Sequence, residues 1–489
     1  MKRLRSSLVI LAFLLLILAR ASSQTPAPSA GQASEVRRDA HVIMISVDGL
    51  VPDYYTSPAR LGLRVPNLVK MKLGGAYAHG VEGVYPSVTY PAHTSLVTGV
   101  RPAIHGIVHN RIFEAPTDPQ TKAWYWFSNA LKTETLWDAA KKAGLVTGSA
   151  GWPVTVGAGI DYNMPEIFDP GERPLTIKRT LEHTTPSLLS SIAGLQLGSD
   201  ASTDGRRTAV SEHIIKTHKP NLMLIHLIDL DGAHHRYGAR SPQALEVTER
   251  EDSYLGRIIE ATRVAGILDR TTFFIVSDHG FADVTRKFEP GVVLVKEKLI
   301  TLGPNGAPVD WKAAAWPAGG SCAIVLRDPG DKETAAKVAE VFERIAKENG
   351  GPVSRVLTPE QLTKLGAVPT AALMLDAAPG VTFGEELRGP AIHPAIDYRG
   401  THGQLPSRAD LRASLVVYGE GAKIGASMPL ARMIDIAPTA ASVLGLRLAS
   451  AEGATIRELL KQTFILPPPP KSKGGEKPEK TTPRSGARE

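Results

Sequence analysis

The chain contains 489 residues, of which 43% are hydrophobic, and it carries a formal net charge of +7. The first 20 residues contribute +4 and residues 467–489 contribute +3, so the chain between them is neutral and the basic balance does not indicate a nucleic-acid-binding surface. Cys322 is the only cysteine, which excludes an internal disulfide and a thiolate metal cluster.

Both ends of the chain have compositions that set them apart from a folded body. Residues 1–23 combine a basic start, the apolar run Leu8–Leu18 and a small-residue end, which is the pattern of a secretory signal peptide. We therefore expect a secreted or periplasmic protein with no transmembrane segment beyond this one, an uncleaved N-terminal anchor being the alternative. Residues 24–40 are predicted to be a linker, and the Pro-, Lys- and Glu-rich residues 467–489 to be disordered.

Three apolar runs of strand length each end at an acidic residue. In chain order they are His41–Val47 before Asp48, Leu222–Ile228 before Asp229 and Asp231, and Thr272–Ser277 before Asp278. Helical patterns at residues 132–143 and 244–265 lie between them. Apolar strands alternating with helices predict an α/β fold with a largely parallel sheet between helices. Ligands bind beyond the carboxyl ends of such strands, so the carboxylates should converge there.

The pattern changes after residue 285, where short strands and one helix-like segment replace the long alternation. We predict a catalytic core in two parts, residues 41–285 and 391–466. A smaller α+β subdomain, residues 286–390, would be inserted between them. The mature chain of roughly 440 residues exceeds the usual size of a single domain, which favours such an insertion.

The polar residues at the strand ends and in one later turn suggest a metal centre. They comprise three carboxylates and three imidazoles, with no sulfur: Asp48, Asp231, His235, Asp278, His279 and His402. Nitrogen and oxygen ligands suit zinc, or less well manganese or iron, and six of them suffice for two ions. Two ions close together can clamp the attacking and leaving oxygens of a phosphoryl displacement. Each residue alone has a plain alternative as a turn or cap residue.

Six motifs together resemble the nucleotide pyrophosphatase/phosphodiesterase family of the alkaline phosphatase superfamily. The resemblance covers about residues 41–450 and implies an alkaline-phosphatase-like core. In chain order the motifs are VDG (47–49), TYPAHTSLVTG (89–99), RPAIHGIVHN (101–110), the D-x-x-x-H of Asp231 and His235, SDHG (277–280) and GTHG (400–403).

The resemblance implies that Thr89 is the nucleophile and that a phosphothreonine forms during turnover. It also implies two Zn²⁺ ions, other divalent metals being possible. One ion would be held by Asp48, Thr89, Asp278 and His279, and the other by Asp231, His235 and His402. Asp229 is the alternative to Asp231, and His234 the alternative to His235.

The chain departs from the family at Ala92, where many diesterase members have an asparagine that helps to bind the phosphoryl oxygen. Asn110 could supply this oxyanion donor instead, or serve only as a turn residue. Tyr90 matches an aromatic position that stacks on a nucleobase in the family, with core packing as its alternative. The segment GWPVT (151–155) brings no cation, which favours diesters or pyrophosphates over monoesters.

These features predict an exported, metal-dependent phosphodiesterase or nucleotide pyrophosphatase acting on a phosphate diester, a nucleotide or another small phosphoryl substrate. A phosphomonoesterase or phosphonate hydrolase with the same machinery is the alternative. From a different class, an inactive binding protein would require a lost ligand or nucleophile, and none is missing. The C/S-x-P-x-R motif of sulfatases is absent from the sequence.

Overall fold

The computed structural model describes residues 36–118, 123–168, 173–195 and 202–467. The expected signal peptide, most of the linker and nearly all of the expected disordered tail lie outside these residues. Among the described residues, no helix has both the length and the apolar character needed to cross a bilayer.

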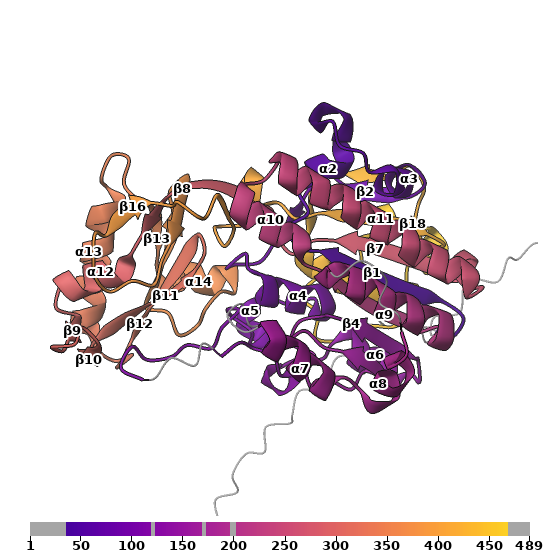
Figure 1. Cartoon of the computed structure of the whole chain (residues 1–489), viewed down its shortest axis with the longest axis horizontal. Helices are drawn as coiled ribbons and strands as arrows, with labels where there is room; N and C mark the ends of the chain where they lie inside the picture. Colours follow the sequence, from indigo (N-terminus) through magenta and orange to yellow (C-terminus); the bar gives the residue numbers. More distant parts are fainter. Residues whose placement is uncertain (1–35, 119–122, 169–172, 196–201, 468–489) are drawn as a thin grey trace, which may run out of the picture. The chain divides into compact units, whose positions relative to one another are not determined.

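An eight-stranded sheet forms the centre of the larger part of the fold (Figure 1). Five neighbouring strands are parallel, and β18 continues the sheet in the antiparallel direction. Its order is β19 (Ser427–Met428), β2 (Ala76–Ala78), β18 (Leu415–Gly419), β7 (Thr271–Val276), β1 (His41–Val47), β6 (Leu222–Leu227), β4 (Thr147–Ala150) and β5 (Tyr162–Met164). The predicted α/β class with a largely parallel sheet is confirmed.

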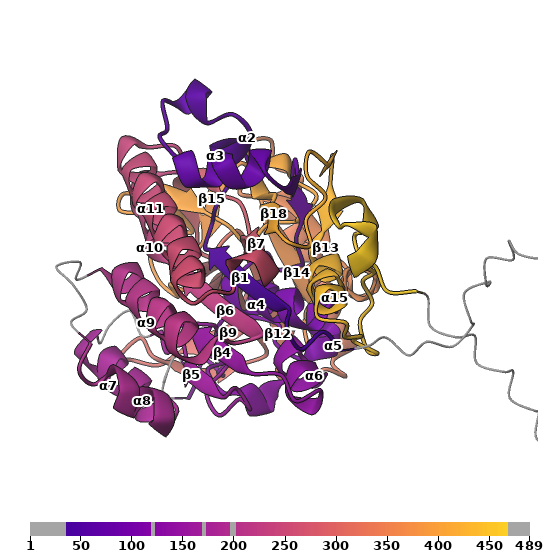
Figure 2. The same cartoon turned by 90° about the vertical axis from the view of Figure 1, so that its right-hand side faces the viewer.

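Helices cover both faces of this sheet because the residues of β1, β6 and β7 alternate between two hydrophobic cores. Met44, Leu224 and Phe274 face one core, and Ile43 and Ile225 face the other. Figure 2 shows the sheet between the two helix layers. The first layer contains α4 (Thr89–Thr98), α6 (Leu136–Lys142) and α15 (Ile436–Val443), and the second contains α3 (Pro66–Leu73), α9 (Thr203–His218), α10 (Asp229–Tyr237) and α11 (Pro242–Val264).

A second group of strands follows β7 and has its own hydrophobic cores. Four strands form an antiparallel sheet in the order β11 (Ala313–Ala318), β12 (Ser321–Leu326), β14 (Leu373–Ala377) and β13 (Val353–Leu357). Strand β8 (Ala282–Phe288) lies between β15 (Gly380–Phe383) and β16 (Ile392–Pro394), and β9 (Ile300–Leu302) pairs with β10 (Pro308–Trp311). The helices here are α12 (Pro290–Lys296), α13 (Lys332–Ala346) and α14 (Pro359–Leu365).

The remaining α-helices and strands of the described residues lie between those already named. They are α2 (Asp53–Thr56), β3 (Val81–Glu82), α5 (Pro102–His105), α7 (Arg173–His183), α8 (Pro186–Ile192), β17 (Gly400–Thr401) and β20 (Ala431–Arg432). The two-residue strand β17 matters most for the site, because it pairs Thr401 with Ala282 at the start of β8. His402, which follows β17, therefore lies beside His279, which precedes β8.

Gly403 allows the chain to turn sharply after His402. Its φ of 108° is unfavourable for residues with a side chain. A Cβ atom there would lie 2.0 Å from the carbonyl oxygen of Ala318, and the adjacent Gly320 N–H donates to the His402 carbonyl at 2.7 Å. The turn thus presses against the β11–β12 hairpin, and this contact fixes the backbone that carries His402.

We expect Gly403→Ala to destabilise the protein because the new methyl group cannot fit without a backbone shift. Gly389→Ala is a matched control, since Gly389 has a φ of 96° and a methyl group added there would have nothing within 4 Å of it. Denaturant unfolding should show Gly403→Ala to be less stable than this control by roughly 1–3 kcal/mol. Equal stability of the two variants would contradict the proposed contact.

Candidate active site

The carboxyl ends of β1, β6 and β7 bring the candidate residues together. Val47 is in register with Leu227, and Ser46 with Val276, so the three strands end at the same level. Asp48 directly follows β1, helix α10 begins just after β6, and Asp278 follows β7 by one residue. The parallel register therefore places acidic side chains from three distant chain segments at one edge of the sheet.

Asp48, Asp278 and His279 form one cluster, and all three are at least 98% buried. The Nε2 atom of His279 lies 2.9 Å from Oδ2 of Asp278 and 3.4 Å from Oδ1 of Asp48. The backbone N–H of Gly49 donates to Oδ1 of Asp278 at 3.1 Å. This contact leaves Oδ2 of Asp278 facing the interior of the cluster.

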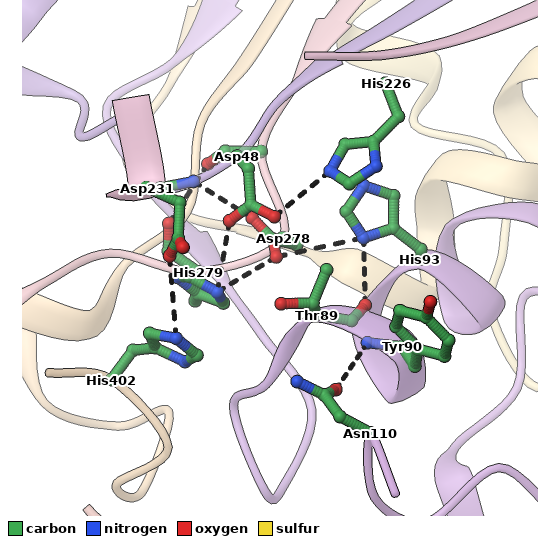
Figure 3. A network of polar contacts seen from close by, with 12 residues as sticks. Asp48, Thr89, Tyr90, His93, Asn110, His226, Asp231, Asp278, His279 and His402 are labelled. Atoms are coloured by element: carbon green, nitrogen blue, oxygen red, sulfur yellow. Dashed lines mark hydrogen bonds and ion pairs between the residues drawn. The ribbon is translucent and has the colours of Figure 1, made fainter. Parts of the chain in front are cut away.

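Asp231, His235 and His402 lie beside the first cluster (Figure 3 shows Asp231 and His402). Asp231 and His235 are four residues apart on α10 and so share one helix face, with Oδ1 and Nε2 3.3 Å apart. Nε2 of His402 lies 3.6 Å from Oδ1 of Asp231, and its ring stacks on that of His279 at 3.5 Å between centroids. His279 thus lies close to both groups of ligand atoms.

The hydrogen bonds of three histidines show which ring nitrogens can bind a metal. In each of them Nδ1 lies close to a backbone carbonyl oxygen. The distance is 2.9 Å from His235 to Gly400, 2.9 Å from His402 to Ser87 and 3.1 Å from His279 to Gly280. A carbonyl oxygen can only accept, so each Nδ1 carries a proton, and the ring nitrogen left to bind a metal in the site is Nε2.

The nitrogen and oxygen atoms that face one another in the site are suited to binding cations. Nε2 of His235 and Nε2 of His402 are only 3.2 Å apart, although both present lone pairs. Buried carboxylate oxygens of Asp48, Asp231 and Asp278 have no hydrogen-bond partner among the described residues. A divalent cation coordinated by these nitrogen and oxygen atoms would satisfy them, and this donor set suits zinc.

Charge crowding affects the pKa values of these groups. Burial, together with the neighbouring carboxylates of Asp278 and Asp231, raises the pKa of Asp48 well above its usual range. Burial and the nearby imidazoles of His279 and His235 lower the pKa of His402 well below its ordinary value. His402 is therefore neutral at physiological pH, as a metal ligand must be.

Thr89 is the first residue of α4 and is partly exposed in a cavity of about 750 Å³ that Asp48, Asp231, His235 and His402 also line. Figure 3 shows the Thr89 side chain facing the aspartates and His279. Its carbonyl oxygen accepts a hydrogen bond from Nδ1 of His93 at 2.8 Å. At a helix N-terminus, free N–H groups and the helix dipole favour a negatively charged group.

Asn110 lies next to Thr89 and lines the same cavity. Its Oδ1 accepts a hydrogen bond from the Tyr90 backbone N–H at 2.8 Å (Figure 3). Because the oxygen is engaged in this way, the amide NH₂ is turned toward the cavity beside Thr89. This orientation suits a donor to a phosphoryl oxygen.

The other two residues of this region are buried, and of these Tyr90 also lines the cavity at Thr89. Ala92 is fully buried in a hydrophobic core against the main sheet. This position therefore does not face the cavity. Tyr90 is also fully buried, in a small apolar cluster with Ile107 and Val154. Its ring contacts Trp124 edge-on at 5.3 Å between centroids.

The two alternative ligands on α10 lie outside both clusters, although Asp229 also lines the cavity at Thr89. Asp229 belongs to a separate acidic group with Asp204 and Glu251, and its Oδ2 is 3.5 Å from Arg250. His234 is buried on another face of α10, where its Nε2 contacts the Tyr54 hydroxyl at 2.9 Å.

A buried chain of charges behind Asp48 was not identified from the sequence. Oδ2 of Asp48 is 3.0 Å from Nε2 of His226, whose Nδ1 is 2.9 Å from Oε2 of Glu166, and this oxygen accepts from Arg207 at 2.8 Å. The one available sequence signal was His226 itself, a polar residue inside the apolar run LMLIHLI. Its partners Glu166 and Arg207 lie 60 and 19 residues upstream, which is too far for a local sequence pattern to show the contact.

Aromatic residues also line the cavity. Trp124 and Phe168 are partly exposed there and contact each other at 4.8 Å between centroids. Tyr398 stacks on His235 at 4.7 Å. Trp124 belongs to the aromatic run WYWF, but the direction of its side chain depends on tertiary packing. Phe168 and Tyr398 carry no comparable sequence signal.

Comparison with known proteins identifies a family. The family model described as type I phosphodiesterase/nucleotide pyrophosphatase matches residues 42–404. Human ectonucleotide pyrophosphatase/phosphodiesterase family member 1 is 25% identical over 247 residues, which are 49% of this chain and 23% of that protein. Venom phosphodiesterase 2 of Crotalus adamanteus is 22% identical over 253 residues, 50% of this chain and 27% of that protein. The chain thus matches about a quarter of the length of these relatives.

Solved structures support the same fold. Human ectonucleotide pyrophosphatase/phosphodiesterase 5 aligns with a TM-score of 0.62 and 19% identity, covering 86% of this chain and all of that one. The murine protein of the same name, solved as an inactive variant in complex with AMP, aligns with the same TM-score at 17% identity and the same coverage. The predicted alkaline-phosphatase-like fold is therefore confirmed.

The positions of the two aspartates on α10 predict different effects on metal binding. Asp231→Asn should lower the bound zinc by about one ion per chain, because one oxygen ligand loses its charge. Asp229→Asn should retain the metal content of the native protein. Elemental analysis after dialysis measures both variants. Full zinc in Asp231→Asn with a loss in Asp229→Asn would reverse the assignment.

The buried contacts of Glu166 with His226 and Arg207 predict a pH-dependent contribution to the free energy of unfolding. Burial alone would raise the pKa of Glu166, but His226 and Arg207 lower it from the ordinary 4.5 to about 2. A lowered folded-state pKa gives stability that is present above about pH 4.5 and is lost as the pH falls toward 2.

Glu166→Gln should therefore cost roughly 3–5 kcal/mol at neutral pH, because His226 and Arg207 lose a buried partner. The variant should also lose less stability than the native protein on acidification. Glu212→Gln, at an exposed pair with Arg257, is the control and should cost less than about 1 kcal/mol. Denaturant unfolding at several pH values tests this, and similar losses in both variants would refute it.

Proposed function

The chain belongs to the type I phosphodiesterase/nucleotide pyrophosphatase family, and on this basis we propose that it hydrolyses phosphodiester or pyrophosphate bonds through a phosphothreonine at Thr89. The observation that carries the proposal is the position of Thr89. It begins α4, is partly exposed in the cavity, and faces two groups of carboxylates and imidazoles that converge from three strand ends.

We assign one metal ion to Asp48, Asp278 and His279 together with the Thr89 hydroxyl, and a second to Asp231, His235 and His402. The inward Nε2 atoms and the unpaired carboxylate oxygens support this assignment. When bound, two zinc ions would favour the alkoxide form of a threonine hydroxyl and stabilise negative charge on the attacking and leaving oxygens.

The reaction then proceeds in two displacements at the same phosphorus. The Thr89 oxygen, having lost its proton to solvent, forms a bond to phosphorus while the bond to the leaving-group oxygen breaks and that oxygen keeps the electron pair. Water next attacks the phosphothreonine and loses a proton. The bond from phosphorus to Thr89 breaks, and the Thr89 oxygen regains a proton.

Asn110 supports both displacements by donating its amide N–H to a non-bridging phosphoryl oxygen. Its carbonyl is held by the Tyr90 N–H, so the amide is already oriented before substrate binds. Such a fixed donor contributes about 2.7–4 kcal/mol to transition-state stabilisation in comparable sites. The negative charge that develops on the phosphoryl oxygens is also favoured by the N-terminus of α4.

The cavity supports a substrate with a sizeable group on the phosphorus. It has a volume of about 750 Å³ and partly exposed aromatic walls at Trp124, Phe168 and Tyr398, which are suited to stacking on a nucleobase. The complex of the murine relative with AMP agrees with a nucleotide as the substrate class. Trp124 and Phe168 present more aromatic surface to the cavity than the buried Tyr90 does.

We further propose that the protein acts outside the cytoplasm. The support is the basic, apolar and small-residue sequence of residues 1–23, together with the names of the relatives, which are ectoenzymes and venom proteins. Cys322 is buried and the sequence offers it no partner, so the fold does not depend on disulfides.

The function is tested by comparing kcat/KM for bis(p-nitrophenyl) phosphate and p-nitrophenyl phosphate with the zinc-loaded protein. We expect a clear preference for the diester. Thr89→Ala should lower both rates by at least about 10³-fold while the zinc content remains. The control is Thr98→Ala, a buried residue at the other end of α4 whose hydroxyl bonds to the Thr94 carbonyl.

The other outcomes are equally informative. Near-normal turnover by Thr89→Ala would refute the phosphothreonine. A preference for the monoester would indicate a phosphatase with the same nucleophile. If neither compound is hydrolysed in a Thr89-dependent way, a phosphonate substrate or a binding role would replace the present proposal.

A further inference from the structure

The cavity at Thr89 continues into a second, smaller cavity of about 290 Å³. The two share Asn110, Trp124, His235, Tyr398 and His402 as lining residues. They therefore meet at residues that would surround the reacting phosphorus in the proposed function. Thr89 lines only the larger cavity.

The smaller cavity differs from the larger one in its charge. Arg111, Lys287 and Glu385 line it, and Arg111 forms an ion pair with Glu385. The ammonium group of Lys287 makes no ion pair or hydrogen bond with any residue that the structure describes. Lys287 thus gives this cavity a positive charge that no neighbouring side chain neutralises.

The strand register explains why Lys287 faces this cavity. In β8 it is the direct partner of Thr382 in β15, and cross-strand partners project from the same face of a sheet. Thr382 also lines the cavity, and its Oγ1 lies 3.2 Å from Oγ1 of Thr401. Because Thr401 immediately precedes His402, the face that carries Lys287 adjoins the metal-ligand candidates.

In-line displacement determines which group enters the smaller cavity. The leaving group departs from the side of phosphorus opposite the nucleophile, and Thr89 lies on the side of the larger cavity. His235 and His402 line both cavities. The leaving group therefore passes these two residues and enters the smaller cavity, while the group that remains on phosphorus occupies the larger one.

We propose that Lys287 binds the phosphate of a departing group, so that the protein cleaves phosphoanhydride bonds in preference to esters whose leaving group carries no phosphate. This inference rests on the proposed function. The bond from the Thr89 oxygen to phosphorus forms as the bond to the bridging oxygen breaks, and the electron pair stays on the departing phosphate. Lys287 keeps its proton and binds the additional negative charge of that phosphate.

The test uses two substrates that share an adenosine 5′-phosphoryl group and differ in the leaving group. ATP releases pyrophosphate, whereas the p-nitrophenyl ester of AMP releases p-nitrophenolate, whose charge lies near the bridging oxygen. The variants are Lys287→Gln and Lys287→Arg. Lys296→Gln removes the same charge from an exposed position on α12 and serves as the control.

We expect Lys287→Gln to lower kcat/KM for ATP by about tenfold or more while changing that for the ester by less than about twofold. Lys287→Arg should restore part of the loss on ATP, and Lys296→Gln should leave both substrates unaffected. The activity on the ester also reports whether the variant is folded.

An unchanged ratio of the two rates in Lys287→Gln would overturn the inference, whether both rates stay normal or fall together. The proposed function would fail in a different way. In that case the native protein itself would release no AMP from either substrate, or its activity would persist in Thr89→Ala.

Discussion

The site depends on the close approach of three carboxylates at one sheet edge. Asp48 and Asp278 are almost fully buried, and Asp231 is partly exposed but lies near enough to raise the pKa of Asp48. Burial raises the pKa of Asp48, and repulsion from the like charges of Asp278 and Asp231 raises it further. The Gly49 N–H on Asp278 and the N-terminus of α4 oppose this repulsion. Cations at the site would complete the compensation.

Further residues in the interior behind Asp48 also stabilise its carboxylate. His226, Glu166 and Arg207 continue inward as a chain of polar contacts, and each is at least 92% buried. A buried charge is tolerated only when it is paired, so these residues determine one another's position. The result is that Asp48 is held by His226 through Oδ2, while Oδ1 remains directed at the cluster. Ligand geometry and core stability are therefore coupled.

Local sequence patterns predicted the central strands to within one residue, because each is an apolar run of strand length that ends at an acidic residue. They also predicted that Asp48, Asp231 and Asp278 would meet, since parallel strands share an edge. The helix predicted to start at residue 132 begins at Leu136, where Thr135 and Asp138 form a capping box. The remaining features of the site depend on tertiary packing. No local sequence pattern shows that Ala92 and Tyr90 are buried, or that Glu166 contacts His226.

In the proposed mechanism, different parts of the fold carry out the chemistry and select the leaving group. Helix α4 and the strand ends of the main sheet supply the proposed nucleophile and most candidate ligands, whereas β8 and β15 supply Lys287 and Thr382 to the smaller cavity. The connection between the two is short, because β17 pairs with β8 and then leads directly to His402. A change in the side chains of β8 or β15 can therefore alter the charge in the smaller cavity without moving Thr89. The same pairing limits such change, because a shift of β8 also displaces the backbone that holds His402.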